Sequence, residues 1–339
     1  MLLQPFSLMI RMLSQSEAYS YFIASQHVST LLFYALNNTI SPLYYILMHF
    51  WIQLFGKGEI VLRSTSLISF AVFIYILHHF FTEHLNILGK KGYLFLLFFV
   101  LNPIFLYFAM SAEPYMLFIA LLSLSNYFLL QKKYTAYLIV SILAGLSHYS
   151  FLLIVLIQGM YVYKTNKKAF PIFMKYVMFV CLVISIVAVF SSISFIQFLL
   201  ILPNLLWIII AFVISFLSMA FYQKKIQHSA LIIFSLFVFL YSFSGLFLSN
   251  FNTQDIRVDF KSVLSIAQKR DVLYIMDEKN YYQALYYFGS AVYIYKLKGI
   301  EMNEIYTIPE NKFVSSLPSY PNKAFIFRSD GVKEARTIQ

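Results

Sequence analysis

Charge is scarce in this chain of 339 residues. Asp, Glu, Lys and Arg together make up 12% of the residues, whereas 60% are hydrophobic and 19% are aromatic. Soluble domains carry about 25% charged residues, so the composition predicts an integral membrane protein. The single cysteine, Cys181, lies in an apolar run and excludes an internal disulfide.

Several sequence patterns are also missing. The chain has no CxxC, Walker A, GxGxxG or GxSxG pattern, so nothing indicates transport driven by nucleotide hydrolysis within this chain. It has no basic stripe interleaved with stacking aromatic residues, although its formal net charge is +11. Nucleic acid is therefore excluded as an expected partner.

Acidic residues are distributed unevenly along the chain. Residues 1–250 hold thirteen Lys or Arg but only four acids, which are Glu17, Glu59, Glu83 and Glu113. Residues 251–339 hold ten acids and twelve bases, a mixture typical of a soluble domain. This shift predicts two domains, a transmembrane domain at 1–250 and a small domain at 251–339.

Apolar runs of about 18–25 residues predict transmembrane helices. These runs lie near 59–82, 93–110, 113–130, 172–192, 204–222 and 229–249. The stretch 134–163 is longer and has Gly145 and His148 in its middle, so two short helices meeting at "GLSHY" are expected there. The predicted fold class is mainly α, a polytopic bundle of about eight or nine transmembrane helices.

The two ends of the chain differ from this pattern. The apolar stretch before Ser14 is too short to cross a bilayer, so the first helix is expected to be truncated and the chain to begin late. Residues 14–56 are amphipathic and rich in aromatics, which favours helices lying at the membrane interface. Residues 251–339 alternate between helix ("DFKSVLSIAQKR", "NYYQALYYF") and strand ("DVLYIMD", "AVYIYKL", "KAFIFRS") patterns, which predicts a small α/β domain.

Lysines gather in alternate connections between the predicted helices, and this bias sets the orientation. The cytoplasmic side receives nine of them: Lys90, Lys91, Lys132, Lys133, Lys164, Lys167, Lys168, Lys224 and Lys225. The opposite, outer side then receives residues 14–58, the turns at 110–114 and 146–149, and the C-terminal domain. The expected location is the cytoplasmic membrane, with a multi-pass topology and an exocytoplasmic C-terminal domain.

Five residues of the outer side are candidates for a site. A carboxylate inside a bilayer costs roughly 2.5–3.5 kcal/mol, so Glu113 and Glu17 are candidate catalytic acids; capping the helix that Pro114 begins is the alternative for Glu113. Arg63 and Lys57 either bind a lipid phosphate or extend to the membrane surface. His148 is either a ligand-binding group or a hydrogen-bonded structural histidine.

Five segments resemble one known family in order and spacing. They are "SEAYSYFIASQ", "SPLYYILMHFWIQLFGKGEIVLRSTSLISF", "NPIFLYFAMSAEPYMLF", "LAGLSHYSFLL" and "DFKSVLSIAQKRDVLYIMDEKNYYQALYYF". Together they are similar to GT-C glycosyltransferases of the protein mannosyltransferase and aminoarabinose transferase superfamily. The resemblance implies a GT-C-like helical bundle and covers nearly the whole chain.

The resemblance implies that the chain transfers a sugar from a polyprenyl-phosphate donor to a glycan, lipid or protein acceptor on the outer membrane face. In such enzymes a carboxylate of the first loop deprotonates the acceptor, and a second acid assists, often through a divalent metal. This chain departs from the family at Ser16, Ile40 and Ser111, leaving Glu17 and Glu113 as the acids. The alternatives are a catalytically inactive member and a transporter or flippase for lipid-linked sugars.

Overall fold

The computed structural model describes residues 13–37, 42–83, 90–148, 151–168, most of 170–179, and, near the C-terminus, 272–275, 281–289, 292–295, 313–314, 323–327 and 333–337. The helices expected at 204–222, 229–249 and 259–270, and most of the one at 172–192, lie outside these residues. The described part is mainly helical, as predicted. It divides into two compact units, residues 1–9 with 23–249 and residues 10–22 with 250–339.

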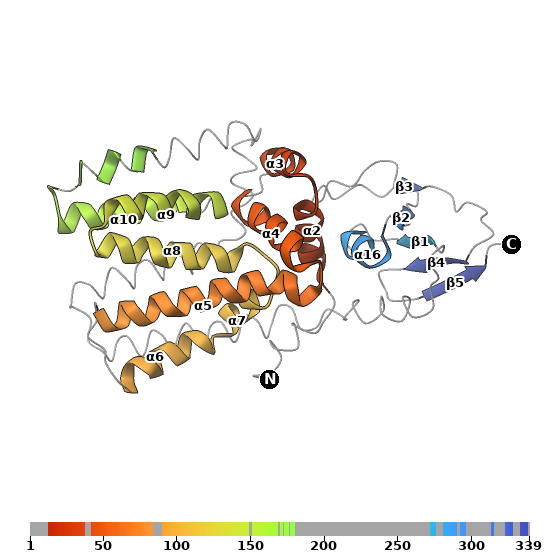
Figure 1. The fold of residues 1–339 in the computed structure, drawn as a ribbon, viewed down its shortest axis with the longest axis horizontal. Helices are drawn as coiled ribbons and strands as arrows, with labels where there is room; N and C mark the ends of the chain where they lie inside the picture. Colours follow the sequence, from red (N-terminus) through yellow and green to blue (C-terminus); the bar gives the residue numbers. More distant parts are fainter. Residues whose placement is uncertain are drawn as a thin grey trace. The chain divides into compact units, whose positions relative to one another are not determined.

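The first unit consists of helices, several of which run alongside one another (Figure 1). Its described helices are α3 (Val28–Asn37), α4 (Pro42–Phe55), α5 (Glu59–Glu83), α6 (Lys90–Val100), α7 (Pro103–Ala109), α8 (Tyr115–Leu130), α9 (Tyr134–Ser147) and α10 (Phe151–Thr165). Helix α8 lies between α5 and α9 and packs against both. The predicted helices at 59–82 and 113–130 are thus confirmed, as is the pair of short helices that meet near His148.

The single helix expected at 93–110 is wrong, because the chain forms α6 and α7 with a break between them. Pro103 is the first residue of α7, and Asn102 before it has an extended backbone. The Asn102 side chain accepts a hydrogen bond from the Ile104 amide at 3.0 Å. Proline has no amide hydrogen to continue a helix, and asparagine is a preferred N-cap, so the chain stops α6 and starts α7.

Helix α5 buries three polar residues among apolar ones and exposes other apolar residues. Arg63, Ser66 and Ser69 are buried, whereas Ile68 is 49% and Tyr75 65% exposed. Among the described residues, α5 alone has both the length and the apolar character of a membrane span, and α8 and α9 are apolar but shorter. Its 25 residues extend about 37 Å at 1.5 Å per residue.

Helix α4 has one buried and one exposed apolar face. Leu47, Phe50 and Leu54 are exposed and recur at helical spacing along one side. At the edge of this exposed face, Trp51 Nε1 donates to the Val61 carbonyl at 3.1 Å and to Ser64 Oγ at 3.0 Å, which fixes α4 against the start of α5. Gly56 ends α4 with a φ of +90°, a backbone conformation that glycine adopts readily.

Buried polar groups join α8, α9 and α10. Tyr137 donates from its hydroxyl to Gln158 Oε1 at 2.7 Å, and Gln158 Nε2 donates to Asn126 Oδ1 at 2.9 Å and to Ser125 Oγ at 3.2 Å. Ser141 Oγ lies 3.4 Å from Ser125 Oγ. All five side chains are buried, so we call them the buried polar network.

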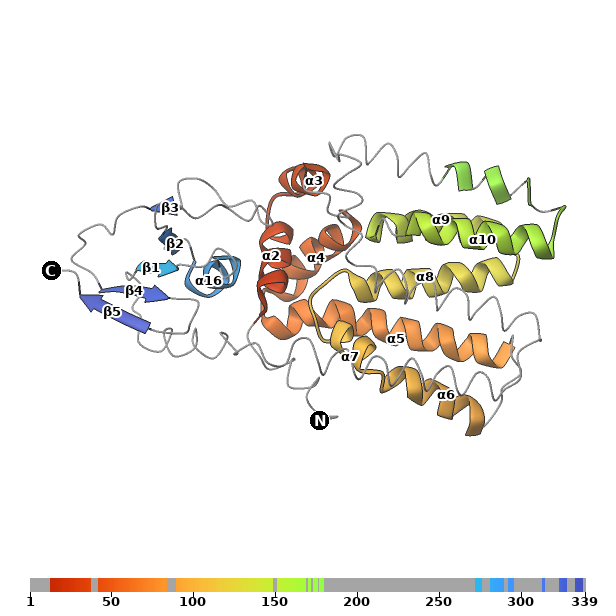
Figure 2. The ribbon, with the colours of Figure 1, turned by 180° about the vertical axis from the view of Figure 1, so that it is seen from behind.

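The second unit contains a five-stranded sheet with one helix against it (Figure 2). The strands are β1 (Val272–Ile275), β2 (Val292–Tyr295), β3 (Phe313–Val314), β4 (Lys323–Phe327) and β5 (Lys333–Thr337), in the order β3-β2-β1-β4-β5. All neighbours are parallel except β4 and β5. Helix α16 (Tyr281–Phe288) connects β1 to β2 and packs on both. The predicted strands β1, β2 and β4 and helix α16 are confirmed; β3 and β5 were not predicted.

Residues 10–22 belong to this second unit, although their sequence placed them in the 1–250 domain. They include most of α2 (Gln15–Ala24), whose aromatic rings meet those of α16: Tyr19 and Phe22 lie 4.9 and 5.0 Å from Tyr282, and Tyr21 lies 4.9 Å from Tyr286. The Leu13 amide also donates to the Tyr287 hydroxyl at 2.7 Å. The tyrosine-rich stretch "NYYQALYYF" therefore holds this N-terminal segment.

Candidate functional site

The connection between α7 and α8 is buried although it is polar. Its residues Met110 to Glu113 each expose 8% or less of their surface. The Ser111 hydroxyl donates to the Phe108 carbonyl at 3.4 Å, and the Ser66 hydroxyl of α5 donates to the Glu113 carbonyl at 3.4 Å. The N-cap of α8 is Pro114, which has no side-chain cap. Glu113 thus lies one residue before the N-cap of α8.

Arg63 lies three residues before Ser66 on α5, and residues at this spacing share one helix face. It is 1% exposed and is the largest fully buried side chain in the described part of the chain. A guanidinium keeps its charge at any physiological pH, and a buried charge needs polar or anionic surroundings. Ser66 bonds the Glu113 carbonyl, and Arg63 shares a helix face with Ser66. The α5 face that meets the backbone of Glu113 therefore carries a fixed positive charge.

His148 lies in the connection between α9 and α10, beside the start of α8. Its ring centroid is 5.9 Å from that of Tyr115 and 5.1 Å from that of Phe118. Burial among these rings lowers the pKa of His148 to about 4, because a charged imidazolium is poorly solvated there. His148 is therefore neutral at physiological pH and can donate or accept a hydrogen bond.

Ser147, next to His148, strengthens the polar character of this end of the helices. It is fully buried, and its hydroxyl makes no hydrogen bond within the described part of the chain. A buried hydroxyl without a partner costs free energy. Ser147 therefore adds an available donor beside His148 and the start of α8.

The remaining two predicted site residues lie elsewhere. Lys57 is exposed in the short connection between α4 and α5. Glu17 belongs to the second unit, where its carboxylate accepts a hydrogen bond from the Ser14 amide at 2.7 Å and its own amide donates to Ser14 Oγ at 3.3 Å. This reciprocal pair is a capping box at the start of α2. The structure thus places Arg63 one helical turn along α5 from Ser66, which bonds the Glu113 carbonyl, and it gives Glu17 a structural role in the second unit.

The described residues do not supply a metal site. No group of three or more His, Cys, Asp or Glu side chains lies close enough to hold an ion among them. The Glu113 carbonyl accepts a hydrogen bond from Ser66, which lies one helical turn along α5 from Arg63. A carboxylate can accept a proton and a guanidinium can bind an anion.

His49 was missed by the sequence analysis. Its Nδ1 donates to the Ala24 carbonyl at 2.8 Å, and Gln53 Nε2 lies 2.8 Å from its Nε2. The carbonyl can only accept, so Nδ1 carries a hydrogen. The signal was the "HFWIQ" stretch, in which His49 and Gln53 are four residues apart on a helix; their arrangement makes His49 a structural residue.

Comparison with protein-family models, with curated proteins and with solved structures finds no match for this chain. The resemblance to GT-C glycosyltransferases therefore rests on the five sequence segments alone.

Proposed function

We propose that this chain is a multi-pass membrane glycosyltransferase. It would transfer a sugar from a polyprenyl-phosphate donor to an acceptor hydroxyl at the outer face of the cytoplasmic membrane. The observation that carries the proposal is the burial of Arg63, Ser66 and Glu113 together with the hydrogen bond from Ser66 to the Glu113 carbonyl. The order of the five sequence segments supports it.

The distribution of polarity in the first unit supports a lipid environment. On α5 the polar residues Arg63, Ser66 and Ser69 are buried together with six apolar residues, while Ile68 and Tyr75 are exposed. The buried polar network repeats this arrangement in α8, α9 and α10. Membrane helices turn polar groups toward one another and apolar groups toward lipid.

The proposed reaction is a displacement at the anomeric carbon of the donor sugar. The acceptor oxygen forms a new bond to that carbon while the bond from the carbon to the phosphate oxygen breaks. The acceptor proton passes to a carboxylate, and the polyprenyl phosphate leaves with the bonding electrons. This chemistry needs one proton acceptor and one cation near the leaving phosphate.

Glu113 is the better candidate for the proton acceptor, and Arg63 for the phosphate partner. Glu113 lies in the connection before α8, and the Ser66 bond ties its backbone to the helix that carries Arg63. A guanidinium binds phosphate through paired hydrogen bonds. Glu17 is held by the capping box of α2, so we assign it no step in the transfer. Lys57 and His148 are assigned to binding the donor.

The test is a transfer assay on the purified full chain with polyprenyl-phosphate sugars as donors and with alcohol or glycan acceptors. Glu113→Gln keeps the size of the side chain but removes the base, so turnover should fall by about 10²- to 10⁴-fold. Glu59→Gln removes a carboxylate from the start of α5 and is the matched control, which should retain activity. Thermal unfolding of each variant checks that the fold is kept.

Two results would contradict the proposal. Equal turnover of Glu113→Gln and wild type would remove Glu113 from catalysis. Absence of transfer by the wild type across a panel of donor sugars, lipid lengths and divalent metals would favour an inactive family member. Donor binding that persists in that case, and that Arg63→Met abolishes, would leave a binding protein for lipid-linked sugars.

A further inference from the structure

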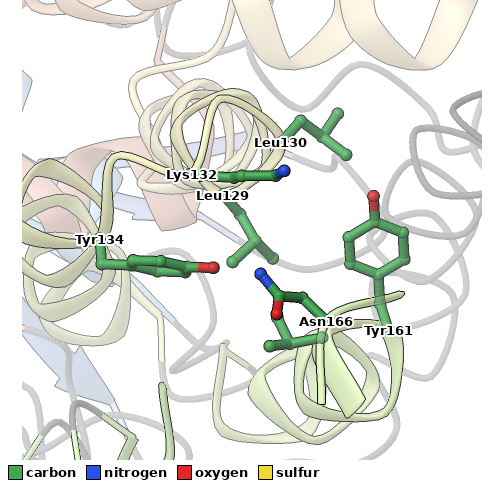
Figure 3. Close-up of a pocket in the computed structure, with 7 residues that line it drawn as sticks. Leu129, Leu130, Lys132, Tyr134, Tyr161 and Asn166 are labelled. Atoms are coloured by element: carbon green, nitrogen blue, oxygen red, sulfur yellow. The ribbon is translucent and has the colours of Figure 1, made fainter. Parts of the chain in front are cut away.

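A small pocket lies where α8 ends and α9 begins, next to the end of α10 (Figure 3). Its volume is about 70 Å³, and a water needs about 10–15 Å³ by the same measure, so it holds roughly five heavy atoms. Its lining residues are Leu129, Leu130, Lys132, Tyr134, Tyr161, Val162 and Asn166. We call it the Lys132 pocket; it shares no residue with the site around Glu113.

The lining of the Lys132 pocket suits an anion attached to an apolar group. Figure 3 shows the Tyr134 hydroxyl and the Asn166 amide pointing toward the same space, with the Leu129 side chain between them and the Lys132 ammonium, which also lines the pocket. Leu129 and Val162 supply an apolar wall, and none of the described residues that line the pocket is a carboxylate. An ammonium, an amide and a hydroxyl can each donate a hydrogen bond to a phosphate oxygen.

The backbone at Lys132 gives an independent reason to examine this lysine. Lys132 has a φ of +59°, a left-handed conformation in which glycine is the usual residue. Its amide donates to the Leu129 carbonyl and the Lys133 amide donates to the Phe128 carbonyl, the pair of bonds that ends a helix in a Schellman motif. Lys132 therefore combines a strained backbone conformation with a cationic side chain that lines the pocket. Strained backbone conformations are found preferentially at functional sites, so this position points to a binding function.

The surface around the Lys132 pocket combines positive charge with exposed apolar groups. Lys133, Lys164 and Lys167 are exposed, and Lys167 Nζ lies 5.9 Å from the centre of the Tyr163 ring. Met160 and Tyr163 on α10 expose more than half of their surfaces. Lysines beside exposed apolar side chains are typical of the level of lipid headgroups.

We propose that the Lys132 pocket binds the phosphate of an anionic lipid headgroup. The phosphate oxygens accept from Lys132, Tyr134 and Asn166, and the acyl chains lie along the exposed apolar side of α10. Free inorganic phosphate shares the headgroup chemistry but not the apolar contact. The inference holds independently of glycosyl transfer, since it uses no residue of that site.

The test uses the purified full chain in an uncharged detergent. Short-chain phosphatidylglycerol, short-chain phosphatidylcholine and inorganic phosphate are titrated separately, and the thermal unfolding midpoint is recorded. Phosphatidylglycerol should raise the midpoint saturably, at concentrations well below those at which the other two act. Lys132→Gly should weaken its apparent affinity about ten- to a hundredfold, the loss expected from one charge-assisted hydrogen bond.

Lys132→Gly also separates binding from folding. Glycine suits the left-handed position, so the variant without lipid should unfold at the wild-type temperature or above it. Lys133→Gln removes an exposed neighbouring charge outside the pocket and should leave the affinity within about twofold of wild type. Equal losses in both variants would show general attraction to a basic surface and overturn the proposal. An equal response to inorganic phosphate alone would replace the lipid by a soluble anion.

Discussion

At the scale of single residues, carboxylates that look alike in sequence have different surroundings. Glu17 and Glu113 are both buried and both lie in segments that resemble the family motifs. Glu17 accepts the Ser14 amide hydrogen inside a capping box, whereas Glu113 precedes a helix whose N-cap is proline. Burial alone therefore does not separate the roles of the two acids, whereas the capping box gives Glu17 a structural role.

We expect Glu17 to stabilise the folded chain and to take no part in sugar transfer. Glu17→Ala removes the acceptor for the Ser14 amide and should destabilise the chain by about 0.5–2 kcal/mol, the range measured for lost helix caps. Glu17→Gln keeps an oxygen that can accept the same bond and should cost clearly less, with sugar transfer retained. The measurement is chemical or thermal unfolding of both variants beside the transfer assay. If Glu17→Gln is stably folded but inactive, Glu17 is a catalytic acid after all.

Both Glu17 and Glu113 could be selected from the sequence because acids are rare in residues 1–250. Their roles could not be assigned from this rarity. The spacing of Ser14 and Glu17 fits a capping box, and the resemblance to the family motif competed with that interpretation.

The burial of Arg63 could not be predicted either. An arginine near a helix end extends to the surface just as readily as it is buried, and the packing of the neighbouring helices decides which occurs.

At the scale of helices and strands, sequence patterns predicted most of the described elements. They did not predict a helix break that depends on one capping residue, or a strand that depends on pairing with its neighbour. Apolar length located α5 and α8, and Gly145 with His148 located the break between α9 and α10. The break at Asn102 was missed because apolar residues flank it on both sides. Strand β5 was missed because "KEART" is polar, and its pairing with β4 supplies what its composition does not.

The buried polar network joins three helices, and Gln158 holds it together. Gln158→Leu removes the acceptor of the Tyr137 hydroxyl and the donor to Asn126. Leaving such buried groups without partners costs about 1–3 kcal/mol, so the thermal unfolding midpoint in detergent should fall. Adding Tyr137→Phe should recover part of the loss, because the second change removes the stranded hydroxyl.

Met160→Leu is the control for this series, because Met160 lies two residues from Gln158 on α10 and is 63% exposed. It should leave the midpoint unchanged. A midpoint of Gln158→Leu equal to that of wild type would show that the hydrogen bonds of the network contribute no net stability. This outcome is a real alternative in membrane proteins, where such bonds contribute about 0.6 kcal/mol on average.

At the scale of the whole molecule, charge and polarity point to the same orientation. The proposed phosphate pocket at Lys132 lies at the end of α8 that the lysine bias assigns to the cytoplasm. Lys57 lies before the start of α5, at the end assigned to the outside. Helix α5 is long enough to separate the two sides, since about 20 residues cross a bilayer and α5 has 25.

This orientation predicts that Lys57 and Lys133 lie on opposite sides of the membrane. Both are exposed, so a cysteine at either position reacts with a maleimide that reaches it. In a Cys181→Ala background, Lys57→Cys should be labelled by a membrane-impermeant maleimide added to intact cells, and Lys133→Cys only after the membrane is opened. Lys133 is chosen over Lys132 because its backbone is not left-handed. Labelling of both positions from the same side would contradict both the topology and the assignment of the Glu113 site to the outer face, because α5 could then no longer cross the bilayer between them.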